Sequence, residues 1–160
     1  MGCHVVSVKR QTNGTDVGLR VQYAYDAFGV RVKKIVDSDG DGTAVAITTL
    51  FAINGWNPPK AAPVGLENVD VYADLDANGS LKTQYLRGEV VDQLLGRIDY
   101  PSGAASPGNI FWNPTDHLGS IREIIDNTGA VRDAIGYDAF GRITSETNAA
   151  ERGRYALEVP

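Results

Sequence analysis

The pentapeptide Tyr-Asp-Ala-Phe-Gly occurs twice in the chain, at residues 25–29 and again at residues 137–141. Each copy is followed by a short alternating segment, Val30–Lys33 after the first and Arg142–Ser145 after the second. A short unit that recurs in this way is typical of repeat proteins, in which the fold follows from stacking one supersecondary element. The recurrence predicts a repetitive architecture and favours a structural or binding role over catalysis.

Alternation of apolar and polar residues surrounds the first copy. Leu19, Val21 and Tyr23 fall on one face of an extended segment, and a second alternating segment follows at 30–35. This pattern predicts strand, turn and strand. Further strands are expected at 44–53, 69–75, 80–86, 89–95, 109–113, 120–125, 130–137 and 142–147. Because no long window shows helical periodicity, the sequence predicts an all-β fold of antiparallel hairpins.

The turns between these strands share an Asp-x-x-Gly pattern. It occurs at 26–29, 37–40, 76–79, 116–119, 126–129 and 138–141. An aspartate that opens a turn accepts hydrogen bonds from its own backbone, and a glycine three residues later takes the positive φ that closes it. We also expect the tyrosines of the repeat to pack across strands and Phe28 and Phe140 to cover the sheet beside their turns.

Composition excludes several functional classes. The 160 residues suffice for one ordinary domain, and the net charge of −5 with a pI near 4.9 does not favour nucleic-acid binding. No apolar stretch is long enough to span a membrane, and Met1–Val6 lacks the features of a signal peptide, so the localisation stays open. The single cysteine, Cys3, is interpreted as incidental.

The segment Tyr-Asp-Ala-Phe-Gly-Arg-Ile-Thr at 137–144 resembles the YD repeat of the Rhs family, and 115–122 resembles a weaker copy. The longer block at 113–148 resembles the start of the Rhs repeat-associated core, and 72–92 resembles the segment that precedes it. The resemblance also covers 19–36. It is poor for 1–18 and 41–68.

The resemblance implies an all-β shell in which hairpin repeats spiral around an effector, as in secreted toxin-encapsulating proteins and related cell-surface proteins. It implies structural roles, without catalysis, for the residues of the repeat motif: Tyr25, Asp26, Gly29, Asp116, Gly119, Tyr137, Asp138 and Gly141. The family core continues into a stretch rich in tyrosine and arginine, whereas this chain ends Leu157-Glu158-Val159-Pro160. We therefore expect a truncated, open section of such a shell.

The resemblance divides the chain into three segments. They are an unassigned segment 1–18, a degenerate repeat region 19–112 with loops near 54–66 and 101–109, and the truncated start of the core at 113–157. Open sheet edges would pair with neighbouring repeat strands of a larger shell or with another copy of the chain. The alternative is a stand-alone β-repeat module that binds carbohydrate or protein, for which Trp56 and Trp112 offer stacking surfaces.

Acidic loops raise one further alternative. Asp37, Asp39 and Asp41, with Gly42, match the first half of a calcium-binding loop, but the twelfth position is Thr48 where a bidentate glutamate is required. Acidic turns explain the same residues. The two histidines, His4 and His117, have no partners at catalytic or zinc-ligand spacing. We therefore expect no catalytic residues and no cofactor, with calcium at this loop as the alternative.

Overall fold

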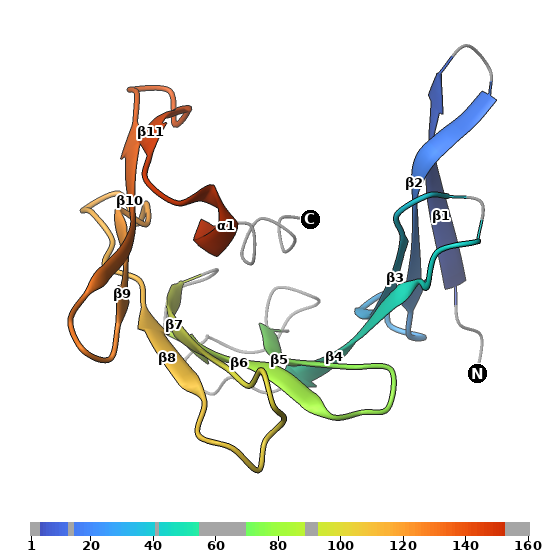
Figure 1. Ribbon diagram of the computed structural model, residues 1–160, viewed down its shortest axis with the longest axis horizontal. Helices are drawn as coiled ribbons and strands as arrows, with labels where there is room; N and C mark the ends of the chain where they lie inside the picture. The colour runs from blue at the N-terminus through green and yellow to red at the C-terminus, as the bar shows by residue number, and fades with distance from the viewer. Residues whose placement is uncertain (1–3, 13–14, 41, 55–69, 89–92, 153–160) are drawn as a thin grey trace. The chain divides into compact units, whose positions relative to one another are not determined.

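The computed structural model describes residues 4–12, 15–40, 42–54, 70–88 and 93–152 (Figure 1). This part of the chain is all-β apart from one short helix, α1 (Ala149–Arg152). The strands are β1 (His4–Thr12), β2 (Thr15–Tyr25), β3 (Arg31–Asp37), β4 (Ile47–Asn54), β5 (Asp70–Leu75), β6 (Leu81–Arg87), β7 (Leu94–Asp99), β8 (Asn109–Trp112), β9 (Glu123–Asp126), β10 (Val131–Tyr137) and β11 (Ile143–Glu146). The strands are ordered in the sheet as in the chain, so the fold is an open run of antiparallel hairpins.

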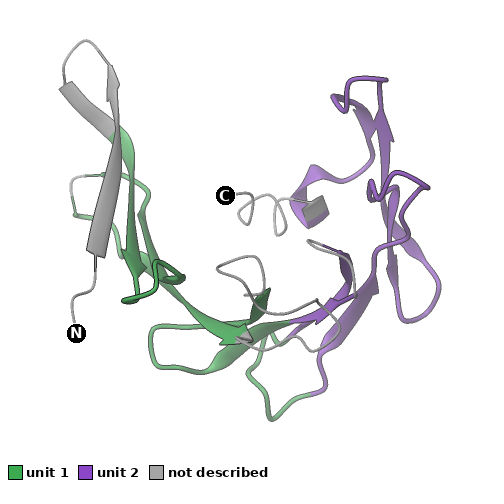
Figure 2. Ribbon diagram, turned by 180° about the vertical axis from the view of Figure 1, so that it is seen from behind, with its two compact units in different colours: residues 1–84, 100–106 green, residues 85–99, 107–160 purple. Residues whose placement is uncertain are grey.

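The chain forms two compact units (Figure 2). One contains residues 1–84 and 100–106, and the other contains residues 85–99 and 107–160. In the first unit β2 pairs with β1 on one side and with β3 on the other. In the second unit β8 pairs with β7 and β9, and β10 pairs with β9 and β11. Each strand therefore pairs with its neighbours in the chain, which is the topology expected of consecutive hairpins.

The all-β prediction is confirmed, and most strands lie where the alternation placed them. Two differences occur. β1 and the start of β2 lie in segment 1–18, where the sequence pattern assigned no strand. The strand predicted at 89–95 is observed as β7, which begins at Leu94, while residues 89–92 lie outside the described part. The loop expected near 101–109 is present between β7 and β8, and most of the loop expected near 54–66 lies outside the described residues.

Few apolar side chains are buried in this sheet. Within the described residues they are Ala73, Tyr85, Ile124 and Ile135. Buried polar or charged residues outnumber them: Lys34, Asp37, Arg97, Asp99, Asn113, Asp126 and Asp133. A sheet whose strands pack mainly against each other buries little apolar area. Hydrogen bonds and ion pairs of buried groups therefore matter more here than in a layered domain.

Arginine side chains cover aromatic rings on the sheet. In the first unit the guanidinium of Arg31 lies 5.3 Å from the ring centroid of Tyr23 and 5.4 Å from that of Phe51, so it links β2, β3 and β4. In the second unit Arg122 lies 5.1 Å from the ring of Tyr137. Such cation–π contacts shield a ring face that a second layer would otherwise cover.

The expectation for the two phenylalanines of the repeat is wrong. Phe28 is 83% exposed and Phe140 is 95% exposed, so neither ring covers the sheet. The reason is positional, because each phenylalanine is the third residue of its Asp-x-x-Gly turn and lies at the turn tip. Tyr25 and Tyr137, which end their strands, are half-buried.

Candidate functional site

The feature that recurs most regularly in the structure is the aspartate turn. At Asp126, the backbone N–H donates to the Ala130 carbonyl over 3.0 Å, and the Gly129 N–H donates to the Asp126 carbonyl over 3.0 Å. One carboxylate oxygen, Oδ1, accepts the N–H groups of Thr128 (2.9 Å) and Ala130 (3.1 Å). The same four hydrogen bonds occur in the turns that begin at Asp26, Asp76, Asp116 and Asp138.

The glycine of each turn has the positive φ that the pattern predicted. Gly141, in the second copy of the pentapeptide, has a φ of +81°, and Gly29, in the first copy, has +80°. No atom of another residue would obstruct a Cβ at either position. The requirement for glycine therefore comes from the backbone conformation alone.

The second carboxylate oxygen of these aspartates contacts a cation in four of the five turns. Arg122 lies 2.8 Å from Asp116 Oδ2, and Arg132 lies 2.6 Å from Asp126 Oδ2. The remaining two pairs are longer and their aspartates are more exposed: Arg142 with Asp138 at 3.3 Å and Lys82 with Asp76 at 4.0 Å. In the Asp26 turn the residue six positions later, where Lys82, Arg122 and Arg132 lie in their turns, is Val32.

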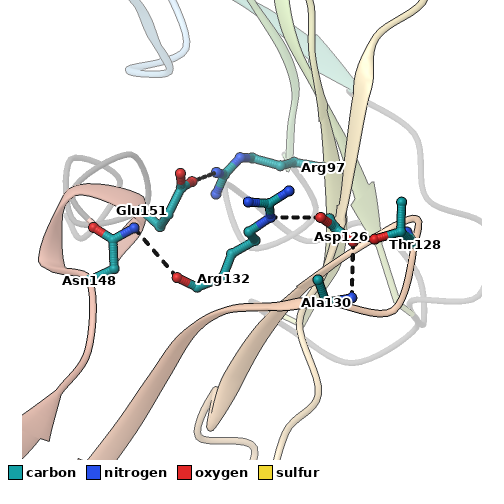
Figure 3. A network of polar contacts seen from close by, with 7 residues as sticks. All are labelled: Arg97, Asp126, Thr128, Ala130, Arg132, Asn148 and Glu151. Carbon is teal, nitrogen blue, oxygen red and sulfur yellow. Dashed lines mark hydrogen bonds and ion pairs between the residues drawn. The ribbon is translucent and has the colours of Figure 1, made fainter.

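The contacts at Asp76, Asp116 and Asp126 favour the charged form of each carboxylate and lower its pKa. The hydrogen bond from the Thr128 hydroxyl contributes most to lowering the pKa of Asp126, and the N–H groups of Thr128 and Ala130 together with Arg132 outweigh the opposing effect of burial (Figure 3). Burial raises the pKa of Asp116, but hydrogen bonds from Ser120, Leu118 and Arg122 bring it below its usual value. The backbone N–H of Ser80 lowers the pKa of Asp76.

The lowered pKa values bear on what these groups can do chemically. A general base that works near neutral pH needs a pKa close to the working pH, and carboxylates reach it through burial or repulsion. Asp76, Asp116 and Asp126 are shifted in the opposite direction. Their oxygens are engaged by the backbone and by cations, which makes them turn anchors.

The acidic loop at 37–42 is also organised around its own backbone. Asp37 Oδ1 accepts the N–H of Gly40 over 3.1 Å, and Asp39 Oδ2 accepts the Thr43 hydroxyl and the Ala44 N–H, each over 2.6 Å. Asp41, the third expected calcium ligand, lies outside the described residues. In the described part of the chain, no group of three or more His, Cys, Asp or Glu side chains is close enough to hold a metal ion.

The described histidine and tryptophan candidates do not form a common site. His117 lies exposed in the 116–119 turn, and Trp112 at the end of β8 is partly exposed. Trp56 and the side chain of His4 lie outside the described residues. No helix in the described ranges has the length and apolar character needed to cross a membrane.

Among the buried charged residues, two that contact the segment after β11 were not identified by the sequence analysis. Arg97 on β7 is 2% exposed, and Asp133 on β10 is 0% exposed. Arg97 lies between Gly96 and Ile98, where alternation places a polar residue toward water, Asp133 shares the face of Ile135, and neither belongs to a motif. Both contact the segment that follows β11, Arg97 through Glu151 and Asp133 through Thr147 and Asn148, and no local sequence signal encodes the return of that segment.

Comparison of the chain with protein-family models and with curated proteins found no match.

Proposed function

We propose that this protein is a non-catalytic structural element, a section of β-hairpin repeat wall whose sheet continues by pairing with further strands. One observation carries the proposal, namely that five turns repeat the same hydrogen bonds around an aspartate and a positive-φ glycine. Every described strand pairing joins chain neighbours, so the sheet is built by adding one hairpin after another. The sequence resemblance to the Rhs repeat supports the more specific proposal that the parent shell encloses an effector.

The chemistry of the turns supports the same proposal. Aspartates whose oxygens accept backbone and arginine hydrogen bonds contribute to stability and specificity of the turn rather than to proton transfer. Each turn also depends only on residues within a few positions of its own aspartate. A wall built in this way can be extended or shortened without redesigning a central core.

Pairing of the terminal strands provides the test. We expect purified protein to associate as its concentration rises in size-exclusion chromatography with light scattering, and hydrogen exchange in β11 to slow in parallel. Thr144→Lys places a charge on this terminal strand and should weaken the association without changing the fold, because edge lysines oppose strand addition. A monomer at all concentrations, with unchanged exchange in β11, would contradict edge pairing.

A second candidate, a module that binds protein or carbohydrate, is favoured by one observation. In the second unit, Leu118 is 77% exposed at the tip of its turn, and Phe140 occupies the corresponding place in the turn between β10 and β11. Exposed apolar side chains at turn tips are suited to contact a partner. Leu118→Ser with Phe140→Ser should abolish capture of such a partner on a glycan or protein array while leaving the melting temperature unchanged.

A further inference from the structure

The segment that follows β11, residues 147–151, returns to the sheet of the second unit and is held there by two buried charged side chains. One of these is Asp133 on β10, and the other is Arg97 on β7. β8 and β9 separate these two strands in the sheet. The segment therefore joins strands that have no ladder hydrogen bonds with each other.

The first attachment is made by one carboxylate oxygen. Asp133 Oδ1 accepts the Thr147 N–H over 3.2 Å, the Thr147 hydroxyl over 3.0 Å and the Asn148 N–H over 2.8 Å. The same threonine hydroxyl accepts the Ala134 N–H over 2.9 Å. The Asn148 side chain donates to the Arg132 carbonyl over 3.4 Å, as drawn in Figure 3. These contacts fix the start of the segment against β10.

The second attachment is an ion pair across 54 residues of sequence. Arg97 Nη2 donates to Glu151 Oε2 over 3.0 Å, and Arg97 Nε donates to Asp99 Oδ2 over 3.0 Å. The guanidinium also lies 4.6 Å from the ring centroid of Phe111 on the neighbouring strand. Asp99 and the Phe111 ring therefore hold the guanidinium from within the sheet. Its Nη2 edge is directed at Glu151 (Figure 3).

From this arrangement we infer that Arg97, Asp99 and Phe111 form an internal carboxylate-binding site, and that Glu151 is its ligand. Residues 147–151 then act as a strap that ties β7 to β10. A guanidinium is the side chain best suited to bind a carboxylate, and its burial strengthens the attraction. A buried charge is costly without partners, so the strap and the site stabilise each other. This inference goes beyond the proposed structural role and does not depend on it.

The two attachments of the strap should be coupled to each other, as two independent contacts would not be. If the segment is held at both ends as one unit, loss of the Glu151 carboxylate should also loosen the attachment at Asp133. The amide N–H of Asn148, which Asp133 accepts, reports this coupling by hydrogen exchange. Glu151→Ala is the suitable change, because Arg97 keeps its pairing with Asp99 and the sheet itself is left intact.

We expect Glu151→Ala to raise exchange at Asn148 about tenfold, the effect of losing one charge-assisted hydrogen bond. Glu123→Ala, which removes a carboxylate from β9 of the same unit, should leave it unchanged. Sodium acetate, compared with sodium chloride at equal ionic strength, should shift the NMR signal of the Arg97 Nε–H in Glu151→Ala by occupying the site beside Arg97, while exchange at Asn148 stays fast because acetate is not joined to the strap. The wild-type protein should not distinguish the two salts.

Two results would overturn the inference. Unchanged exchange at Asn148 in Glu151→Ala would show that the two attachments are independent and that there is no strap. An Arg97 Nε–H signal that acetate and chloride affect equally in Glu151→Ala would show that Arg97 does not form a carboxylate-binding site.

Discussion

The turns at 26–30 and 126–130 have the same backbone hydrogen bonds but differ in the side chains that surround the aspartate. Asp126 additionally accepts the Thr128 hydroxyl over 2.6 Å and the Arg132 guanidinium over 2.6 Å, and it is 7% exposed. In the first turn the corresponding positions are Phe28, which is exposed, and Val32. The comparison shows that aspartate and glycine suffice to specify the backbone of the turn. The neighbouring residues determine how strongly the charged carboxylate is held.

The largest effect should come from the element that both turns share. Gly29→Val forces a β-branched residue to a φ of +80°, and Gly129→Val forces one to +85°. We expect each variant to lose about 1–3 kcal/mol of unfolding free energy. Gly29→Asn and Gly129→Asn should cost much less, because asparagine tolerates this region. Urea denaturation measures the differences. A valine variant that folds with unchanged stability would show that its turn does not require the positive φ.

A smaller effect should separate the turns. Asp26→Asn and Asp126→Asn both keep an oxygen that can accept the backbone N–H groups, but both remove the charge. We expect Asp126→Asn to lower the melting temperature more, because only Asp126 holds both Thr128 and Arg132. Differential scanning calorimetry of the two variants in the same buffer provides the measurement. Equal shifts would mean that Thr128 and Arg132 add nothing to the turn.

Many of the features that the two turns share could be predicted from the sequence. Alternation placed most strands, and the Asp-x-x-Gly spacing predicted the turns with their positive-φ glycines, because both depend on residues close together in the chain. The contact between the second carboxylate oxygen and a cationic side chain was not predicted, although Lys82, Arg122 and Arg132 each lie six residues after their aspartate. That spacing brings the two side chains together only once the hairpin has formed.

Other features were beyond local patterns. Phe28 and Phe140 were expected to pack on the sheet, since an aromatic residue in a repeat is usually buried, but the turn places both at its tip. Arg97 lies between Gly96 and Ile98, where alternation places an exposed residue, and Asp133 shares the face of Ile135, but nothing in either strand signals the contacts with Glu151, Thr147 and Asn148. Those contacts depend on tertiary structure that strand periodicity does not report.

The pH dependence of stability gives a further test of the Asp126 turn. The Thr128 hydroxyl is the main contributor to the lowered pKa of Asp126 in the folded protein, while an unfolded chain titrates near its ordinary value of about 4. The charged carboxylate therefore stabilises the fold fully above about pH 4 and progressively less as the pH falls toward the folded-state pKa. Melting temperatures between neutral and acidic pH should decrease less in Asp126→Asn than in the wild type. Identical pH profiles would contradict this contribution.

The smallest effect is expected from transferring the arginine contact to the first turn. Val32 follows Asp26 by six residues, as Arg132 follows Asp126, so Val32→Arg should bring a guanidinium to the free side of the Asp26 carboxylate. A double-mutant cycle with Asp26→Asn isolates the new contact from the loss of the valine side chain. For a pair near the surface we expect a coupling of about 0.2–1 kcal/mol, decreasing with added salt. A matching cycle with Arg132→Gln and Asp126→Asn gives the native reference. Coupling in the native pair alone would show that Arg132 depends on the surroundings of its own turn, whereas coupling in both would show that the spacing of six residues is sufficient.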